Sequence, residues 1–279
     1  MSTKITVLVE NRAAARDVLA EHGLSLWIEH EGHNVLFDTG AGRAIRPNAR
    51  ARQIALDEAE AVVLSHGHYD HTGGLIQVLE LASPPVYAHP AAFQPKFKQY
   101  TDGRVLQINR EKVDEEHIRR LGSEIRHVEQ PTEIVEGLFA TGPVPRETDF
   151  ETPPADFFLD EACTVHDTLV DDQSLYFLTE QGPIVLCGCA HSGVVNTLRY
   201  VAKLTGQAPY GVFGGMHLLN SSRDVIDRTI REMQELGVVL YGPAHCTGVG
   251  MTAVLWTTVG TNFRDFCCGD VVEFYGSSK

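Results

Sequence analysis

The sequence predicts an α/β protein whose β-sheets are covered by helices, organised as one domain over residues 1–279. Strand-like apolar runs joined by short turns fill the first part of the chain, and strands alternate with helix-like segments in the second part. Because both kinds of element recur in both halves, one layered domain is favoured over two independent ones. A length of 279 residues fits a single domain of this class.

The first ninety residues combine a hairpin with a strand that leads into a helix. The expected elements are strands at Ile5–Glu10, Leu24–Glu29 and Asn34–Asp38, a helical turn at Ala41–Arg46, a strand at Ala61–Ser65, a helix at Thr72–Leu81 and a strand at Val86–Ala88. A turn of His, Glu and Gly residues separates the second and third strands, which predicts the hairpin. We expect Pro47 to end the helical turn, because proline cannot donate a backbone hydrogen bond.

Residues 90–170 are less regular, and we interpret them as an insertion that shapes a pocket. Their expected elements are a helix at Glu111–Leu121, strands near Glu124–Val128 and Leu138–Thr141, and a proline-rich acidic loop at residues 151–154. Regular alternation then resumes, with strands at Ser174–Thr179, Pro183–Cys187, Tyr210–Phe213 and Val238–Tyr241, and helices after Gly193 and at Arg223–Leu236. The last of these helices follows a capping-box pattern, Ser221-Ser-Arg-Asp224.

Composition and charge exclude several classes of protein. Hydrophobic residues make up 43% of the chain, which is enough for a large core, and the net charge is −14. Such an acidic surface repels phosphate backbones, so general nucleic-acid binding is not expected and a small-molecule substrate is. No apolar run is long enough for a membrane helix and the start does not resemble a signal peptide, so we expect a cytoplasmic protein. No oligomeric state is predicted.

The strongest chemical signal is the segment from Ser65 to Gly74, which carries three histidines and an aspartate within six residues. Imidazole and carboxylate groups are ligands of zinc, iron and manganese. In extended backbone, His66 and His68 point to the same side and can bind one metal ion. Asp70 and His71 then turn toward a second position, at the spacing of about 3.5–4 Å that two-metal sites use. The alternative is a solvated histidine-rich loop.

Three later histidines also follow apolar strands, where α/β folds gather their active sites. They lie in Cys187-Gly-Cys189-Ala-His191, in Gly214-Gly-Met-His217 and in Pro243-Ala-His245. A single histidine is more often structural, but several at strand ends reinforce one another. Each is therefore a candidate for completing a metal site.

His66-x-His68-x-Asp70-His71 resembles the signature of the metallo-β-lactamase-fold superfamily, and Phe37-Asp38-Thr-Gly resembles the superfamily strand that ends in Asp. The resemblance implies a four-layer αββα sandwich. One branch, proteins labelled 7,8-dihydropterin-6-methyl-4-(β-D-ribofuranosyl)-aminobenzene-5′-phosphate synthases, is more similar, from about residue 5 to about residue 250. The segments that carry this similarity are Glu21–Ser25, Thr141–Arg146, Asp171–Gln173, Gly188–His191, Gly214–Leu218 and His245–Gly248.

With this resemblance in view, two metal sites are expected, occupied by zinc, with manganese or iron as alternatives. The expected ligands are His66, His68 and His191 for one metal and Asp70, His71 and His245 for the other, with Cys189 between them and Asp38 orienting a ligand histidine. Most superfamily members carry a bridging Asp where this chain has Gly188-Cys189, which leaves the number of metals open. His166, near the place of an earlier superfamily histidine, lies in an acidic loop and is a weaker candidate.

His217 and Arg146 are the remaining candidates, both for substrate binding. His217 could act as a general acid or could be a hydrogen-bonded histidine in a glycine turn. Arg146 follows the stiff turn Gly142–Pro145 and could bind phosphate through its guanidinium, or could pair with Glu147 or Asp149 at the surface.

These residues predict a metal-dependent hydrolase-type enzyme, in which metal-activated hydroxide attacks a small, phosphorylated or heterocyclic substrate and Asp70 steers the proton of the nucleophile. The branch resemblance implies a pterin-pathway condensation. Two alternatives stay open: an iron-dependent oxidoreductase on the same scaffold, and a non-enzymatic metal or ligand sensor. An open metal site disfavours the sensor, because structural zinc is closed by four protein ligands.

Overall fold

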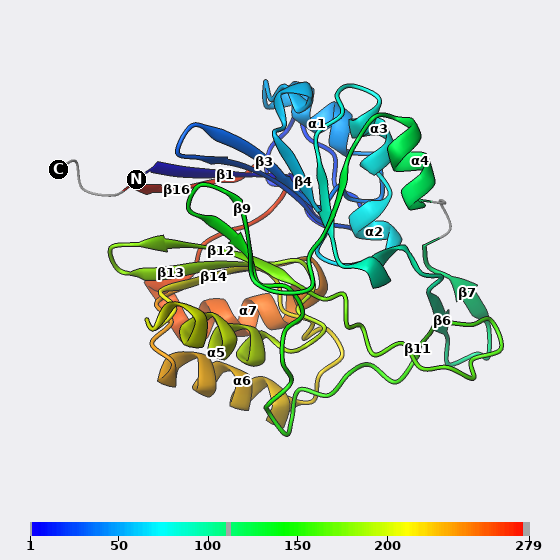
Figure 1. Cartoon of the computed structure of the whole chain (residues 1–279). Helices are drawn as coiled ribbons and strands as arrows, with labels where there is room; N and C mark the ends of the chain where they lie inside the picture. Colours follow the sequence, from blue (N-terminus) through cyan, green and yellow to red (C-terminus); the bar gives the residue numbers. More distant parts are fainter. Residues whose placement is uncertain (1, 110–112, 276–279) are drawn as a thin grey trace.

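The structure is a computed structural model that describes residues 2–109 and 113–275. Two large β-sheets pack face to face, and helices cover the outer face of each sheet (Figure 1). The predicted αββα sandwich of a single domain is therefore confirmed. In the described part of the chain, no helix has the length and apolar character needed to cross a membrane.

The first sheet has seven strands, and its order differs from the order of the sequence. From edge to edge it contains β16 (Val271–Tyr275), β1 (Ser2–Val9), β2 (Ser25–His30), β3 (His33–Phe37), β4 (Ala61–Val63), β5 (Val86–Ala88) and β8 (Ile125–His127). Side chains alternate between its two faces: Val35 and Phe37 of β3 pack against the second sheet, whereas Leu36 packs under the helices. Because both faces are covered, Val35, Leu36 and Phe37 are all apolar, and apolar runs of this kind are what predicted the first strands.

The second sheet has six strands and the same alternation. From edge to edge it contains β15 (Leu240–Ala244), β14 (Gly211–Gly215), β13 (Gly182–Cys187), β12 (Ser174–Thr179), β10 (Leu138–Ala140) and β9 (Thr132–Val135). Ile184 and Leu186 of β13 face the first sheet, and Val185 faces the outer helices. The core between the sheets therefore consists of every second residue of the central strands.

The helices divide between the two outer layers (Figure 1). Over the first sheet lie α1 (Ile45–Ala51), α2 (Tyr69–Thr72), α3 (Leu75–Leu79) and α4 (Glu115–Arg120). Over the second sheet lie α5 (Val194–Thr205), α6 (Arg223–Glu235) and α7 (Val249–Val259). Short 3-10 helices connect other elements: η1 (Leu56–Glu58), η2 (Pro90–Phe93), η3 (His245–Thr247) and η4 (Gly260–Asn262).

Only part of the expected insertion at residues 90–170 lies outside the main sheets, because β8, β9 and β10 are strands of the sandwich. A separate three-stranded sheet projects from one end of the molecule (Figure 1). It contains β11 (Phe157–Phe158), β6 (Phe97–Gln99) and β7 (Val105–Gln107). These strands were not predicted, because β6 and β7 each include a polar residue among only three positions and β11 has only two residues, so none forms the apolar run that marks β4 or β5.

Several predicted boundaries were wrong for identifiable reasons. The helix expected at Ala41–Arg46 is α1, which begins at Ile45 and contains Pro47 in its first turn, where no backbone donor is needed. The helix expected at Thr72–Leu81 is two short helices, α2 and α3, separated at Gly73 and Gly74. The expected strand Val238–Tyr241 is β15, which continues to Ala244, so His245 follows it directly.

The segment expected to form a helix at Glu111–Leu121 contains α4, which starts after the side-chain cap of Asp114. Residues 111 and 112 of that expected helix lie outside the described residues. No element was predicted beyond residue 250, where the structure has α7 and the edge strand β16.

Candidate metal centre

The candidate site lies where strand ends of the two sheets face each other. β3 and β4 run parallel in the first sheet, and β13, β14 and β15 run parallel in the second. Parallel strands present their carboxyl ends at one edge, so the loops that follow them meet there. Asp38 follows β3, the segment 66–71 follows β4, Cys189 and His191 follow β13, and His245 follows β15.

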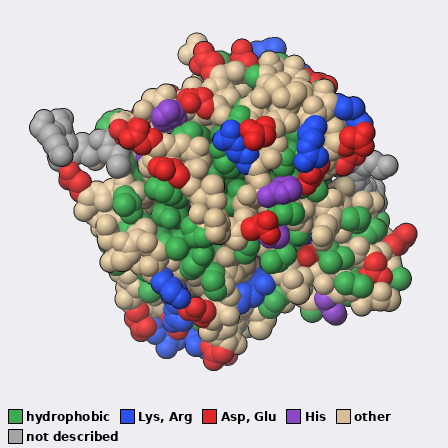
Figure 2. Space-filling view, viewed as in Figure 1, with side chains coloured by type: hydrophobic (Ala, Val, Ile, Leu, Met, Phe, Trp, Pro, Cys, Tyr) green, Lys and Arg blue, Asp and Glu red, His purple; other side chains and the backbone are tan. Residues whose placement is uncertain are grey.

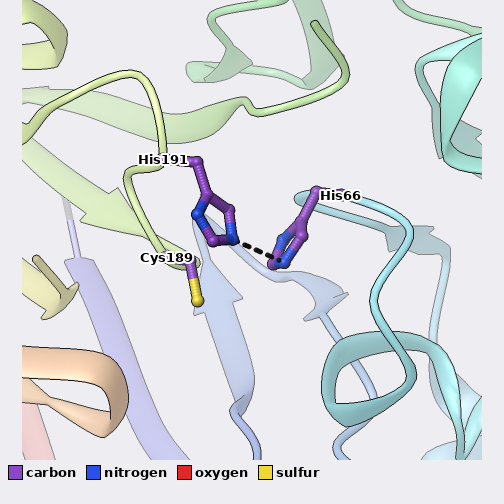
Figure 3. A group of neighbouring side chains, drawn as sticks. All are labelled: His66, Cys189 and His191. Carbon is purple, nitrogen blue, oxygen red and sulfur yellow. Dashed lines mark hydrogen bonds between the residues drawn. The ribbon is translucent and has the colours of Figure 1, made fainter. Parts of the chain in front are cut away.

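The first cluster joins the loop after β4 to the loop after β13 (Figure 3). The donor atoms of His66, Cys189 and His191 all lie within 4.8 Å of one another, and the Nε2 atoms of the two histidines are 3.2 Å apart. His68 lies beside them, with its ring centroid 4.4 Å from that of His66 and 5.0 Å from that of His191. The structure therefore brings together the three histidines expected at one metal.

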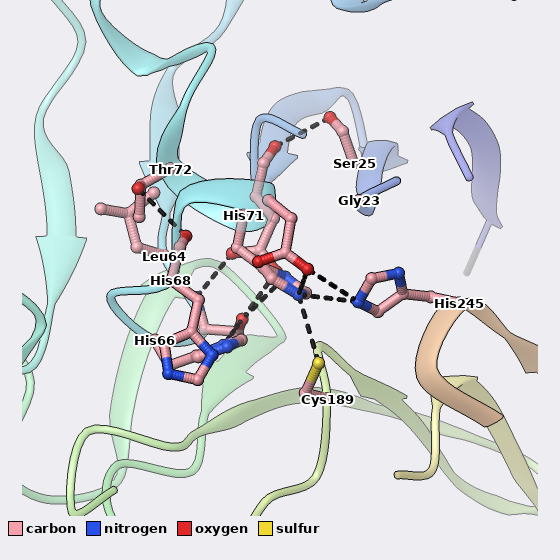
Figure 4. Close-up of polar contacts among 12 residues, drawn as sticks. Gly23, Ser25, Leu64, His66, His68, His71, Thr72, Cys189 and His245 are labelled. Carbon is pink, nitrogen blue, oxygen red and sulfur yellow. Dashed lines mark hydrogen bonds and ion pairs between the residues drawn. The ribbon is translucent and has the colours of Figure 1, made fainter. Parts of the chain in front are cut away.

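The second cluster lies next to the first and shares Cys189 with it (Figure 4). The donor atoms of His71, Cys189 and His245 also lie within 4.8 Å of one another. The Nε2 atom of His71 is 3.2 Å from the Cys189 Sγ and 3.2 Å from the His245 Nε2. Asp70 Oδ2 approaches the same group, at 3.3 Å from His245 Nε2 and 3.8 Å from His71 Nε2.

His22 is a member of this centre that the sequence analysis missed. Its Nε2 lies 3.2 Å from Asp70 Oδ2, and His22, Asp70 and His245 form a third group of donor atoms within 4.8 Å of one another. The signal was present, because the segment Glu21–Ser25 carried part of the family resemblance. However, His22 follows no apolar strand end, and this is why it was not chosen.

A buried carboxylate fixes the orientation of His71. Asp38 Oδ2 lies 2.6 Å from His71 Nδ1 and accepts a hydrogen bond of 2.6 Å from Ser65 Oγ, while its Oδ1 accepts one of 2.7 Å from the Ser65 backbone N–H. Because Nδ1 is engaged with the carboxylate, Nε2 is the ring nitrogen that faces the cluster. Asp38 therefore lies where the sequence analysis expected it.

His245 is oriented from the other side by the end of β1. Its backbone N–H donates to Glu10 Oε1 at 2.7 Å, and its Nδ1 lies 2.9 Å from Asn11 Oδ1. Asn11 Oδ1 also accepts from the Gly23 backbone N–H at 3.1 Å, next to His22. The contacts of His245 with Glu10 and Asn11 join residues more than 200 positions apart, and no local pattern in the sequence predicts them.

The segment Asp171–Gln173 is hydrogen-bonded to both loops that carry the candidate ligands. Asp172 accepts hydrogen bonds from the backbone N–H groups of His191 and Ser192, at 3.0 and 2.8 Å. Gln173 Nε2 donates to the Leu64 carbonyl at 2.8 Å, directly before the histidine loop. This explains in physical terms why the segment was part of the family resemblance.

Asp171 connects the histidine loop to a buried lysine. Its Oδ2 accepts from the Gly67 N–H at 2.8 Å, and its Oδ1 lies 3.0 Å from Lys96 Nζ, which also pairs with Asp167 at 2.7 Å. All three charged side chains are buried. A Cβ on Gly67 would lie 2.1 Å from the Ala92 carbonyl oxygen, so only glycine fits this close approach.

Replacing Lys96 with Met is expected to destabilise the protein by about 3–5 kcal/mol, because two buried carboxylates lose their counter-charge. Urea unfolding of the metal-free protein measures this. Lys203→Met, an exposed lysine at the end of α5, is the control and should change stability by less than about 0.5 kcal/mol. Equal stability of the Lys96 variant and the wild type would show that the ion-pair cluster does not support the loop.

The electrostatics of the first cluster favour neutral imidazoles. Burial lowers the pKa of His66, His68 and His191 well below the usual histidine range, and neighbouring histidines lower it further. Neutral imidazole is the form that ligates a metal. Burial also raises the pKa of the Cys189 thiol well above its usual value, so its thiolate forms only with a cation beside it.

The second cluster stabilises positive charge. Burial would raise the pKa of Asp70, but His71, His22 and His245 outweigh it and hold that pKa well below its usual range. Burial would likewise lower the pKa of His71, yet Asp38 and Asp70 raise it to about 9. A buried position at which carboxylates hold a proton this firmly is also suited to a metal cation.

A cavity of about 640 Å³ opens onto both clusters. Its lining includes His68, Asp70, Cys189, His191 and His245. The three-stranded sheet and the proline-rich loop also contribute to the lining, through residues 98, 100 and 150–157. On the face shown in Figure 2, acidic and basic side chains are interspersed, so the net negative charge does not form one continuous field there.

The remaining candidates differ in their placement. His217 lines the cavity with its ring centroid 4.4 Å from that of His191, and burial together with Lys98 lowers its pKa to about 4. Arg146 is not among the described residues that line the cavity. Of its two expected surface partners, Asp149 pairs with Arg228 at 2.6 Å. His166 stacks on Phe158 in the three-stranded sheet.

The donor set fits divalent metal ions. His68 Nε2 and His191 Nδ1 are buried without a hydrogen-bond partner, although buried polar atoms are normally satisfied. Imidazole, carboxylate and thiolate donors in this mixture suit zinc, and also iron or manganese. The ligand groups expected from the sequence could therefore hold such ions where they stand.

Comparisons with known proteins agree with this geometry. The model of the metallo-beta-lactamase superfamily matches residues 19–190. The chain is 30% identical to a Methanocaldococcus jannaschii protein named 7,8-dihydropterin-6-methyl-4-(beta-D-ribofuranosyl)-aminobenzene-5'-phosphate synthase, over 97% of this chain and 96% of that protein. It is 35% identical to an uncharacterized protein of the same organism, over 88% and 90% of the two chains.

Among solved structures, the chain resembles Tm1679, described as a metal-dependent hydrolase of the beta-lactamase superfamily. The TM-score is 0.82 at 30% identity, and the match covers 99% of this chain and 100% of the other. This protein therefore belongs to the metallo-beta-lactamase superfamily.

Proposed function

We propose that this protein is a metal-dependent hydrolase-type enzyme acting on a small molecule that carries a phosphate or a heterocycle. One observation carries the proposal. Imidazole, carboxylate and thiol donors that follow strands of both sheets lie close together beside one cavity. Its volume of about 640 Å³ is in the range of small-molecule sites.

Two metal positions follow from the two donor clusters. The proposed ligands are His66, His68 and His191 at one position and Asp70, His71 and His245 at the other, with Cys189 close to both. When bound, zinc or a similar cation acts as a Lewis acid and makes water nucleophilic at neutral pH. Cys189 is the proposed substitute for a bridging carboxylate, because its Sγ belongs to both donor groups.

The chain itself contributes hydrogen bonding and positioning. Asp70 Oδ2 faces His22 and His245 at 3.2 and 3.3 Å, so this ionised carboxylate can accept a hydrogen bond from a nucleophile and orient it. His217, with its pKa lowered to about 4, is neutral at pH 7 and can donate one ring N–H to the substrate. Asp38 and Asn11 keep His71 and His245 in fixed orientations.

A pterin-related condensation is the finer form of this proposal. The Methanocaldococcus jannaschii relative is named a synthase of a dihydropterin joined to a ribofuranosyl-aminobenzene phosphate. Aromatic side chains in the cavity wall, including Tyr69, Tyr100 and Phe157, could pack against an aromatic or pterin ring. This supports a flat aromatic substrate for the present chain.

An activity panel tests the proposed class. Protein loaded separately with zinc, manganese or iron is assayed against phosphoester, lactone and thioester substrates. We expect turnover with zinc or manganese on at least one substrate, and none after removal of the metal by a chelator. Oxygen consumption by the iron form without any hydrolysis would instead favour the oxidoreductase alternative, and equal turnover with and without metal would reject the proposal.

A further inference from the structure

We propose that Lys98 forms an anion-binding subsite in the cavity wall, which holds a phosphate or carboxylate of the substrate apart from the bond that reacts. This inference rests on the proposed function and adds the residue that selects an anionic substrate. Lys98 belongs to β6, and it is the only lysine or arginine among the described residues that line the cavity. Arg146, the cation expected from the sequence, is absent from that lining.

Two aromatic rings fix the position of the Lys98 ammonium. Its Nζ lies 4.9 Å from the ring centroid of Phe157 and 5.7 Å from that of Tyr100. Contacts of this kind attract a cation to the ring faces. The ammonium is therefore held beside the cavity rather than free in solvent, and it retains donor hydrogens for an anion.

The single acidic contact of Lys98 among the ion pairs of the described residues is weak and exchangeable. Asp156 Oδ2 is 3.4 Å from Lys98 Nζ, and the two side chains are 44% and 31% exposed. Such a pair contributes only about 0–1 kcal/mol. Pairing between β6 and β11 places both residues at the wall, since Phe157 is in register with Lys98 and Gln99 N–H donates to the Asp156 carbonyl. A phosphate, with more charge and more acceptors, would displace the Asp156 carboxylate.

Phe157 lies next to both this subsite and the proposed metal-binding cluster. Its ring centroid is 4.8 Å from that of His68 and 5.7 Å from that of His191, with Lys98 also close to the ring. One aromatic side chain is therefore in contact with both the ammonium and the histidines. An anion at Lys98 serves as an anchor, while a different bond of the same molecule reaches the metal-binding residues.

The test uses binding of phenyl phosphate to the metal-free protein, measured by calorimetry, with phenol as the uncharged probe. Metal-free protein excludes phosphate binding to a cation and requires no turnover, so a failure here is distinct from a failure of the activity panel. The variants are Lys98→Met, Lys98→Arg and Asp156→Asn. Lys4→Met is the matched control, because Lys4 also forms a half-exposed ion pair on a strand, with Glu29, outside the cavity.

We expect Lys98→Met to weaken phenyl phosphate binding by at least about tenfold, the effect of losing a charge-assisted hydrogen bond. Lys98→Arg should retain binding within about threefold, and Asp156→Asn should tighten it, since a competing carboxylate is removed. The affinity for phenol should be the same in all variants. Lys4→Met should bind phenyl phosphate as tightly as the wild type does. Three results would overturn the proposal: no binding of phenyl phosphate to the wild type, unchanged affinity in Lys98→Met, or an equal loss for phenol and phenyl phosphate.

Discussion

Replacing His68 and Asp70 together with alanine is expected to abolish both metal binding and turnover. His68 Nε2 is buried without a hydrogen-bond partner, and Asp70 Oδ2 faces two imidazole nitrogens at 3.2 and 3.3 Å. The double variant removes one ligand from each proposed metal position. Because three-ligand positions retain little affinity after losing a donor, neither position should fill at micromolar zinc.

Thermal unfolding with and without zinc measures this loss independently of activity. A ligand that binds only the folded state stabilises it, by about 2.7 kcal/mol at 100 times its Kd. Zinc should therefore raise the melting temperature of the wild type but not that of the double variant. The matched control is His33→Ala with Glu60→Ala, a histidine–carboxylate pair 2.9 Å apart at the surface. Full activity and an unchanged response to zinc in the His68/Asp70 variant would reject the proposed ligand set.

Replacing Asp38 with asparagine is expected to weaken zinc binding by about 10–100-fold, the usual cost of losing the partner that orients a ligand histidine. Asp38 is fully buried and contacts His71 and Ser65 through three short hydrogen bonds. Asparagine retains one acceptor oxygen, but its NH₂ group replaces the second carboxylate oxygen and can only donate. Either Ser65 or His71 then loses its partner, and the correct tautomer of His71 is no longer enforced.

Asparagine is the sharper substitution at this position because the backbone of Asp38 has a φ of +58°, which asparagine tolerates better than alanine does. Zinc affinity is measured by competition with a coloured chelator, and stability by urea unfolding. Asp38→Ala is the comparison, and it should lose about 3–5 kcal/mol of stability as well, because buried donors are left unpaired. Unchanged zinc affinity in Asp38→Asn would show that the carboxylate supports only the fold.

The strands could be predicted because both of their faces are covered, which leaves short apolar runs in the sequence, and the four-layer arrangement was implied by the family resemblance. Leu26 and Ile28 of β2 face one core while Trp27 faces the other, and the same period of two marks β3, β12 and β13. The histidine loop was equally evident, because four donor side chains lie within six residues after a strand. Cys189 and His191 were chosen for their position after an apolar strand, and the structure brings their donor atoms close to that of His66, with Gly188-Cys189 in place of the usual Gly-Asp.

The residues that were missed act through contacts distant in sequence. Glu10 and Asn11 reach His245 across more than 230 positions, and Lys96 meets Asp171 under the histidine loop. Single polar residues of this kind carry no period and no motif. The sequence analysis considered Arg146 for anion binding and did not consider Lys98, because β6 is a three-residue strand whose place at the cavity depends on β7 and β11.

The most direct test of the two-metal proposal is anomalous diffraction from crystals soaked in zinc, recorded at the zinc absorption edge. We expect two peaks, one among His66, His68 and His191 and the other among Asp70, His71 and His245, with Cys189 Sγ beside both. A single zinc peak next to Cys189 Sγ would show that the centre holds one metal ion and would reject the second position. An absence of density at these residues, with zinc bound elsewhere or nowhere, would contradict the proposal.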